Sequence, residues 1–471
     1  MNVPPRALVL RLILRGMLAG ALLGLSTLAT RGDEVRYTFD DPGKDWEKPA
    51  FDAGGWQTAA DLPAFAARWH EATATDAWVR VARDMTWQEV NGSYFQVAQD
   101  GTIQLFANGK FLASNRKPAA QLQSYTAGHS SEVVGRNVYG LHLTAETGAR
   151  QVRVEHVITP LLPVEERIVR AEPSLREQTR DSEVCLGADG RYYLAATSGG
   201  PGFFYGARAW MENEGVMLRR SSDLLSWENL GWVWTFDRDA TWAREPGKFH
   251  GRPARAVWAP EISHFNGKYW LAYSVNHTAP GHAFGIGILR ADKPEGPWRD
   301  VSPDRPVSEG YDPSLFRDDD GSVYLLRNKS LIARLKDDLS APAEPFHAVA
   351  CANYPYVGFE GPCLFKYKGR YHFAAAETLL HADGKTSYDC VVASADRLAG
   401  PYGPRYVAIR YGGHNGFFVD KVGQLRATVW KLPGADLQVV TPRIEMTPEG
   451  ILQPAREDCQ PSPPAGEATP R

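Results

Sequence analysis

The chain has 471 residues, of which 43% are hydrophobic and 23% charged, so it is long enough for two globular domains and too apolar to be intrinsically disordered. The formal net charge is −3 and no dense run of lysine and arginine occurs, which argues against a nucleic-acid-binding protein. Five scattered cysteines, an odd number without metal-ligand spacing, imply no disulfide framework.

The N-terminal residues are typical of an export signal. Arg6, Arg11 and Arg15 form a basic region, and the apolar run at residues 16–29 is too short to span a bilayer comfortably. A short membrane anchor that stays in place is the alternative. We predict that residues 1–31 are a signal peptide and that the mature protein is secreted or periplasmic, with no membrane contact after signal removal.

Residues 34–163 predict a β-sandwich. Alternating apolar positions flank Asn108-Gly109, which favours a hairpin with a primed turn, and residues 151–157 alternate again. In the run at residues 52–63 and in the Asn108-Gly109 hairpin, the region resembles the galactose-binding-like jelly-roll domains that accompany many glycosidases. Such domains either bind sugar or pack against a catalytic unit, and the residues leave both open.

One layout recurs five times after a proline-interrupted linker at residues 164–179. In each repeat an apolar strand leads to a turn with a glycine, and a second strand follows. Counting back nine residues from the turn glycine reaches five equivalent positions: Asp181, Trp258, Asp312, Glu360 and His414. Their spacings of 77, 54, 48 and 54 residues bracket a propeller blade of roughly 40 to 50 residues. We therefore predict an all-β protein in which a five-bladed β-propeller fills residues 180–455, with a disordered tail at 456–471.

The five equivalent positions are the candidate functional site. The innermost strands of a propeller begin at one face, so these residues ring the mouth of the central funnel. Three carboxylates and a histidine that face one small volume are costly unless function or a cation holds them. A single carboxylate in such a place is more often a strand cap, but three at one offset favour chemistry.

The second region resembles the five-bladed glycoside hydrolases of family 43. The phrases that carry the resemblance are Trp258-Ala259-Pro260-Glu261-Ile262, Tyr311-Asp312-Pro313-Ser314-Leu315-Phe316 before Asp318-Asp319-Asp320-Gly321, Glu360-Gly361-Pro362, and Gly413-His414-Asn415 with Phe417-Phe418. One departure is Asp181-Ser182-Glu183, where the family usually has Asp-Pro. Glu183 is thus a neighbouring carboxylate, although the nine-residue count favours Asp181.

The resemblance implies an inverting glycosidase that needs no cofactor. Asp181 would be the general base and Glu360 the general acid, while Asp312 would orient Glu360 and raise its pKa by like charge. His414 would hold a water, an ion or a substrate hydroxyl. Because the histidine contacts a central calcium in some relatives, a structural Ca²⁺ reached by His414 through water is an alternative. For Asp318, Asp319 and Asp320 a hairpin turn is preferred to a calcium site.

Substrate identity is assigned to the loops. Trp258 would floor a sugar subsite or simply plug the funnel, and Phe204 and Trp242 lie in long loops that would surround a terminal sugar or only cover the surface. The resemblance implies a carbohydrate partner with arabinose-, xylose- or galactose-type linkages. A non-catalytic carbohydrate-binding propeller is the alternative, and arginines between residues 244 and 255 keep a glycoside phosphorylase as a third.

Overall fold

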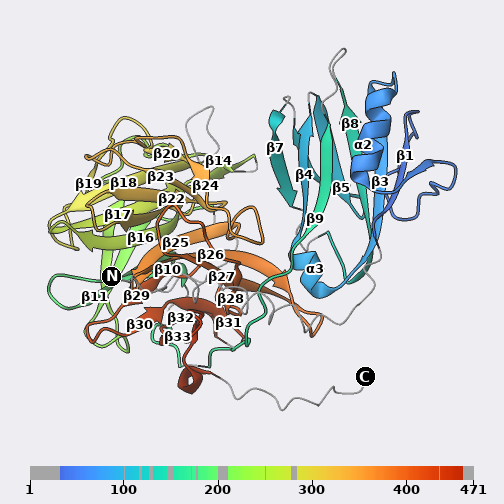
Figure 1. Ribbon diagram of the computed structural model, residues 1–471. Coiled ribbons are helices and arrows are strands. Elements are labelled where there is room, and N and C mark those ends of the chain that lie inside the picture. Colours follow the sequence, from blue (N-terminus) through green and yellow to red (C-terminus); the bar gives the residue numbers. More distant parts are fainter. Residues whose placement is uncertain are drawn as a thin grey trace, which may run out of the picture. The chain divides into compact units, whose positions relative to one another are not determined.

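The computed structural model describes residues 32–99, 101–115, 119–126, 131–145, 152–170, 172–176, 179–199, 211–249, 251–276, 284–433 and 435–459 (Figure 1). The chain divides into two compact units. The first holds the described residues up to Thr86 and from Phe95 to His156, and the second holds Trp87–Tyr94 and the described residues from Val157 onward. Within this part of the chain no helix is long and apolar enough to cross a membrane. The predicted signal peptide lies outside the described residues.

The first unit is a β-sandwich, as predicted. Its larger sheet has the strand order β2-β1-β3-β8-β5-β6, made of Gln57–Ala59, Glu34–Thr38, Asp76–Met85, Gly135–Thr144, Thr102–Ala107 and Lys110–Asn115. The smaller sheet has the order β7-β4-β9, made of Ala119–Thr126, Ser93–Gln99 and Arg153–Ile158. Alternate residues such as Val79, Val81 and Leu141 are fully buried, because successive side chains of a strand point to opposite faces.

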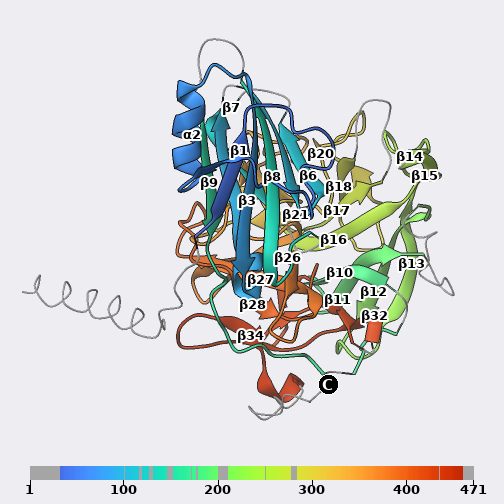
Figure 2. The same cartoon turned by 90° about the vertical axis from the view of Figure 1, so that its right-hand side faces the viewer.

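The Asn108-Gly109 hairpin between β5 and β6 is confirmed. Both residues have positive φ, 49° and 81°, which a primed turn requires. A difference from the prediction is the helix α2 (Leu62–Glu71), which lies against β1 and β2 (Figure 2). Asp61 caps it by accepting a hydrogen bond from the backbone N–H of Ala64 at 2.7 Å, and Pro63 occupies its first turn. The capping residue and the proline were visible in the sequence, but the alternating apolar pattern around them favoured strands.

The short helix α3 (Trp87–Asn91) belongs to the second unit, although the chain returns to the first unit at Phe95. The side chain of Asn91 donates to the backbone oxygen of Leu380 at 2.7 Å and accepts from its N–H at 3.0 Å. Arg405 donates to the backbone oxygen of Asn91 at 3.0 Å. The predicted continuous domain over residues 34–163 is therefore interrupted at residues 87–94, where Asn91 is hydrogen-bonded to Leu380 and Arg405.

The second unit carries the predicted propeller. Each of its first four blades is an antiparallel sheet in which four strands follow one another in chain order. The first blade contains β10 (Thr179–Leu186), β11 (Tyr192–Ser198), β12 (Gly215–Ser221) and β13 (Glu228–Thr235). The second contains β16 (Val257–Phe265), β17 (Lys268–Val275), β18 (Gly285–Ala291) and β19 (Arg299–Asp300), and β20 (Ser308–Glu309) also pairs with β18. A separate hairpin of β14 (Gly247–Phe249) and β15 (Arg252–Ala254) precedes this blade in the chain. The third contains β21 (Ser314–Arg317), β22 (Val323–Arg327), β23 (Leu331–Arg334) and β24 (His347–Ala348), and the fourth contains β25 (Glu360–Tyr367), β26 (Arg370–Leu380), β27 (Thr386–Ala395) and β28 (Tyr406–Ile409).

The fifth blade is built from strand pairs. They are β29 (Phe417–Val419) with β30 (Leu425–Ala427), and β33 (Ile444–Met446) with β34 (Leu452–Pro454), while the hairpin β31 (Val429–Leu432) and β32 (Ala435–Val440) lies between them in sequence. An isolated bridge from Arg426 to Arg443 joins the two pairs. The first strands of the blades contact one another in the order β10, β16, β21, β25, β29 and back to β10, which closes the ring.

The predicted linker and the first residues of the predicted tail have partners in the second unit. Bridges join Val169 to Cys459 and Leu175 to Val439, so the linker packs along the last blade. Prolines interrupt the periodicity of the linker in the sequence, and its backbone pairs with residues far along the chain. Residues 456–459 of the predicted disordered tail include a 3-10 turn (Arg456–Asp458), and the rest of the tail lies outside the described residues.

Candidate active site

Each blade carries one residue with positive φ where its first strand begins. The five are Asp181 (55°), Ala259 (42°), Asp312 (56°), Gly361 (54°) and His414 (53°). In the first, second and fourth blades a register shift marks the same place as a β-bulge. Bulges bend a strand and re-aim its side chains, and Asp and His are among the residues that tolerate this conformation. One backbone device, repeated five times, thus positions the predicted site residues.

His414 links the carboxylates of the first and third blades. Its Nδ1 lies 3.4 Å from Oδ1 of Asp181 and 3.7 Å from Oδ2 of Asp312. The same Oδ2 of Asp312 accepts the backbone N–H of Gly361 at 3.0 Å, which draws Asp312 to the start of the fourth blade beside Glu360. The structure therefore brings Asp181, Asp312, Glu360 and His414 into one cluster.

Two bulge N–H groups hold the acids of the preceding blades. Gly361 donates directly to Asp312, whereas the N–H of Ala259 donates to Oγ1 of Thr197 at 2.7 Å, and this hydroxyl donates to Oδ2 of Asp181 at 2.9 Å. Gly361 has a second constraint, since a Cβ there would lie 2.6 Å from Cγ of His414. Positive φ and this close approach together require glycine at the position.

Asp181 is held in its ionised form. Burial alone would raise the pKa of Asp181, but the charges of Arg180 and His414 and the hydrogen bonds from Thr197 and Arg180 outweigh burial and hold the pKa below its usual value. Nε of Arg180 donates to Oδ1 of Asp181 at 3.2 Å. A carboxylate that stays ionised and keeps a defined orientation is suited to accept a proton.

The other two members of the cluster titrate differently. Burial raises the pKa of Asp312 to about 7; His414 opposes this shift, whereas Glu360 and Asp181 add to it. Burial lowers the pKa of His414, but the carboxylates of Asp312, Asp181 and Glu360 overcome burial and raise it above its usual value. The neighbouring carboxylates therefore favour the cationic imidazole, and that positive charge offsets the repulsion between the surrounding acids.

Three further side chains complete the cluster, and the sequence analysis missed them. Tyr388, on β27, donates its hydroxyl to Oε1 of Glu360 at 2.7 Å. The guanidinium of Arg180 lies over the ring of Trp430 at 4.8 Å, and Nε1 of Trp430 donates to the backbone oxygen of His414 at 2.8 Å. Arg180 directly precedes Asp181 and was findable from the sequence. Tyr388 and Trp430 carry no local signal, because Tyr388 reaches Glu360 across the sheet of the fourth blade and Trp430 meets Arg180 only where the fifth blade closes on the first.

Trp258 belongs to an aromatic group beside the acids. Its ring is 7% exposed and lies 5.2 Å from Phe249 and 5.6 Å from Phe284, measured between ring centroids. Phe284 in turn lies 5.2 Å from Tyr311, the residue before Asp312. Trp258 is thus mostly buried, while Phe249, Phe284 and Tyr311 are partly exposed. These rings continue the cluster with an apolar surface on the side of the second and third blades.

Two predicted substrate-binding residues are not part of this cluster. Trp242 packs against the core of the first two blades and stacks on Tyr273 with ring centroids 6.2 Å apart, so its observed contacts are those of a packing residue. Trp242 lies in the loop between β13 and β14, as the sequence suggested, but its indole packs against the core because core contacts stabilise its large apolar surface. Phe204 lies outside the described residues.

The departure at Glu183 is explained by a second carboxylate pair. Burial and the nearby Glu261 raise the pKa of Glu183 well above its usual value. Burial also raises the pKa of Glu261, to about 7, against a hydrogen bond of 3.1 Å from the N–H of Leu315. Both carboxyl groups are thus harder to ionise than Asp181, whose pKa is held below its usual value, so Asp181 is the better candidate for a base.

The described residues do not fit a directly ligated cation. Among them no group of three or more His, Cys, Asp and Glu side chains has the arrangement of a metal site. Nδ1 of His414 faces two carboxylates. In the turn before Gly321, Asp318 and Asp320 accept backbone N–H groups at 2.8 Å, as expected for a hairpin. No chemical step below depends on a metal.

Parts of this chain are similar to known proteins. The xylosidase/arabinosidase 43B of Humicola insolens is 30% identical over 211 residues, covering 40% of this chain and 35% of its own. The extracellular exo-α-(1→5)-L-arabinofuranosidase ArbA of Cellvibrio japonicus is 26% identical over 214 residues, covering 40% and 60%. The crystal structure of the GH43_1 enzyme from Xanthomonas citri complexed with xylotriose has a TM-score of 0.47 at 21% identity, covering 62% of this chain and 97% of that one.

The family assignment rests on a longer match. The chain spans about a third of the length of the Humicola relative and three-fifths of the Cellvibrio one. The model of the glycosyl hydrolases family 43 matches residues 171–425, which is more than half of the 471 residues and includes all five of the equivalent positions. The chain therefore belongs to family 43 of the glycosyl hydrolases.

Proposed function

We propose that this protein is an exported glycoside hydrolase that cleaves arabinose- or xylose-type linkages of polysaccharides with inversion. The observation that carries the proposal is the convergence of Asp181, Asp312 and Glu360 around His414, whose pKa these carboxylates raise. Inversion requires an acid on the leaving oxygen and a base that activates water on the opposite face of the sugar. The cluster supplies carboxylates in different electrostatic surroundings for these two tasks.

In this proposal Asp181 is the general base. It takes a proton from the water that attacks the anomeric carbon, while Thr197 and Arg180 keep its two oxygens oriented. Glu360 is the general acid and donates its proton to the glycosidic oxygen that leaves. Tyr388 positions the carboxyl of Glu360 through the hydrogen bond to Oε1.

Asp312 and His414 are positioning residues in the proposal. Asp312 connects the N–H of Gly361 to His414, so it fixes the backbone from which Glu360 extends. His414 stabilises the ionised form of Asp181. A structural calcium reached by His414 through water stays a proposal, and its test is activity and melting temperature with and without EDTA.

The substrate class follows from the relatives. One is named for xylose and arabinose linkages and another for α-(1→5)-L-arabinofuranose linkages. A galactose-type linkage is the third option. Phe249, Phe284 and Tyr311 would supply an apolar wall against which the C–H faces of a sugar ring pack.

The experiment compares wild type, Asp181→Asn and Glu360→Gln on aryl arabinosides, xylosides and galactosides and on arabino- and xylo-oligosaccharides. Release of reducing sugar by wild type only, with the opposite anomer seen first by NMR, supports the proposal. Retention of the anomeric configuration, or equal release by wild type and both variants, contradicts it.

Two alternatives have distinct outcomes in the same experiment. Binding without release by wild type would indicate a carbohydrate-binding propeller, and release only with phosphate would indicate a phosphorylase. The structure disfavours a phosphate pocket at two arginines, because Arg244 donates to the backbone oxygens of Ala240 and Asp237, and Arg255 pairs with the carboxylate of Asp237 at 2.7 Å. These guanidinium groups stabilise the loop to which they belong, so their donors are already used within the protein.

A further inference from the structure

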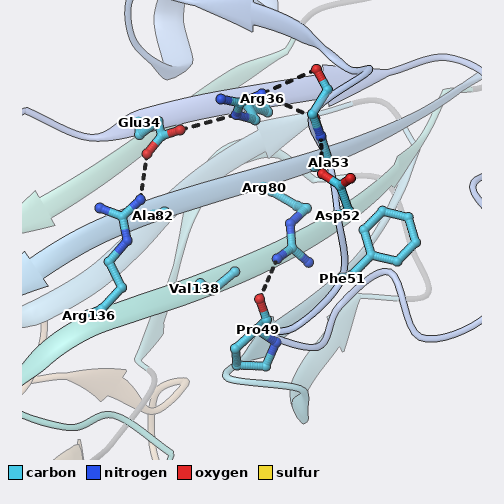
Figure 3. Close-up of a pocket in the computed structure, with 11 residues that line it drawn as sticks. Glu34, Arg36, Pro49, Phe51, Asp52, Ala53, Arg80, Ala82, Arg136 and Val138 are labelled. Carbon is cyan, nitrogen blue, oxygen red and sulfur yellow. Dashed lines mark hydrogen bonds and ion pairs between the residues drawn. The ribbon is translucent and has the colours of Figure 1, made fainter.

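The outer face of the larger sandwich sheet carries a pocket of about 390 Å³ (Figure 3). On β3 the residues of this face are Arg80, Ala82 and Asp84, and the neighbouring strand places Val138 beside Ala82 and Arg136 beside Asp84. The small Ala82 and the Val138 side chain form a low floor between long arginines. The volume lies within the range of about 300 to 1,000 Å³ typical of ligand sites.

The segment before β2 closes one side of this pocket. Pro49, Phe51 and Ala53 line it, and the side chain of Asp52 accepts the N–H of Gly54 at 2.8 Å, which holds the turn. The ring of Phe51 faces the guanidinium of Arg80 at 5.5 Å. An aromatic ring beside polar donors is the usual composition of a sugar site, because a sugar has apolar C–H faces and polar edges.

Arginines outnumber carboxylates among the residues that line the pocket, and Asp84 lies just outside it, 3.9 Å from Arg136. Three arginines line it, Arg36, Arg80 and Arg136, against two carboxylates, Glu34 and Asp52. Glu34 is shared: Arg36 lies 3.1 Å from one of its oxygens and Arg136 lies 2.5 Å from the other. One carboxylate thus forms ion pairs with two guanidinium groups. This arrangement shows that a carboxylate fits between Arg36 and Arg136.

Arg80 is the more unusual of the three arginines. It is 6% exposed, and it donates to the backbone oxygens of Trp46 and Pro49 and, at 3.0 Å, to that of Lys48. In the described part of the chain no carboxylate lies within ion-pair distance of it. Burial lowers the pKa of Arg80, against the charge of Glu47. A buried charge that is hydrogen-bonded but not neutralised favours an anion from outside.

We propose that this pocket binds an anionic pyranose, a sugar residue that carries a carboxylate or a sulfate ester. The planar guanidinium groups match the two oxygens of such an anion, and Phe51 contacts the ring face. Arg36 and Arg136 are 33% and 50% exposed, so a ligand can reach them. The sandwich would then select acidic branches of a polysaccharide, a property independent of the chemistry proposed for the propeller.

The test uses the full chain with Glu360→Gln, so that hydrolysis does not consume the ligand and failure of the enzymatic proposal does not affect the result. Isothermal titration is carried out with a xylo-oligosaccharide bearing a glucuronic acid branch, its neutral counterpart, a sulfated oligosaccharide and inorganic sulfate. We expect the uronate to bind at least tenfold more tightly than the neutral sugar, with affinity that falls as salt rises.

Arg36→Gln and Arg136→Gln are each added to this protein, with Arg153→Gln as the matched control. Arg153 is a surface arginine on β9 of the other sheet, paired with Glu155 at 2.8 Å. We expect about a tenfold loss of affinity in each pocket variant and none in the control, with unchanged melting temperatures. Tight binding of only the sulfated sugar supports the proposal and assigns the anion as a sulfate ester.

Four results would overturn it. They are no binding of any sugar, equal binding of neutral and acidic sugars, binding of inorganic sulfate as tight as that of the acidic sugar, and an equal loss in the control variant. Because Arg36 and Arg136 are not core residues, misfolding is not expected to obscure the comparison. If one pocket variant is nevertheless unstable, the other and Phe51→Leu give the same readout.

Discussion

Both units of this protein gather charged side chains, but they balance them differently. In the propeller cluster, His414 lies beside the carboxylates of Asp181 and Asp312, which raise its pKa, and Arg180 also pairs with Asp181, so these two acids have basic partners within the protein itself. In the sandwich pocket, three guanidinium groups face two carboxylates, and Arg80 has no ion pair among the described residues. An internally balanced cluster keeps its geometry without a ligand, whereas a surplus of one sign favours capture of the opposite sign.

The strongest test of the balanced cluster removes one acid while its neighbours stay. Asp181→Asn and Glu360→Gln are each expected to lower kcat by a factor of about 10² to 10⁴, because each removes a group that transfers a proton in the transition state. Circular dichroism and melting temperature should remain close to wild type. Activity within tenfold of wild type in either variant would remove that residue from its proposed role.

A second balanced cluster lies away from the acids and tests the same principle through stability. Nδ1 of His381 lies 2.9 Å from Glu166 and Nε2 lies 2.7 Å from Asp389, with Ser387 also hydrogen-bonded to the ring and Arg410 paired with Glu166. Burial lowers the pKa of His381, but these carboxylates overcome burial and raise it to about 9.

The sign of the effect follows from the raised pKa. The stabilisation is complete below the unfolded value of 6.5 and is lost as pH rises through about 9. The shift corresponds to about 3 kcal/mol at about 1.36 kcal/mol per pKa unit. Urea unfolding at pH 6 and pH 9.5 should show this additional loss in wild type and not in His381→Gln. The same pH dependence in both proteins would contradict the assignment.

Tyr388→Phe tests whether the neutral hydroxyl of Tyr388 contributes to catalysis through Glu360. The hydroxyl donates to Glu360, so its removal is expected to lower kcat about tenfold with little change in KM, as for loss of one hydrogen bond to a charged or reacting group. Tyr367→Phe, at the opposite end of β25, is the control and should retain wild-type kcat. A change confined to KM would assign Tyr388 to substrate binding instead.

Arg180→Gln gives the smallest effect at neutral pH. Arg180 helps to hold the pKa of Asp181 below its usual value, so its loss raises that pKa and moves the acidic limb of the kcat/KM profile to higher pH. At neutral pH, where Asp181 stays ionised, the rate should change little. An acidic limb that does not move would show that His414 and Thr197 alone set the ionisation of Asp181.

The sequence alone predicted the propeller because its signals are local. Each blade repeats an apolar strand and a turn glycine, and the turn residues Gly190, Gly267, Gly321, Gly369 and Gly423 all have positive φ. The nine-residue offset therefore located Asp181, Asp312, Glu360 and His414 before any contact was known. The helix α2 was missed although its cap and proline were visible, since an alternating pattern around it favoured strands.

Tertiary structure decided what surrounds those residues. The sequence did not show that Trp242 packs against the core, that the linker pairs with the last blade, or which groups contact Glu360. These contacts depend on partners distant in sequence, some more than a hundred residues away. Tyr388 and Thr197 reach the acids across the sheets of their own blades, and Trp430 meets Arg180 only when the ring closes. The sequence thus determined which side chains begin each blade, because that information is short-range, and only closure determined their ionisation, because electrostatic neighbours are set by long-range packing.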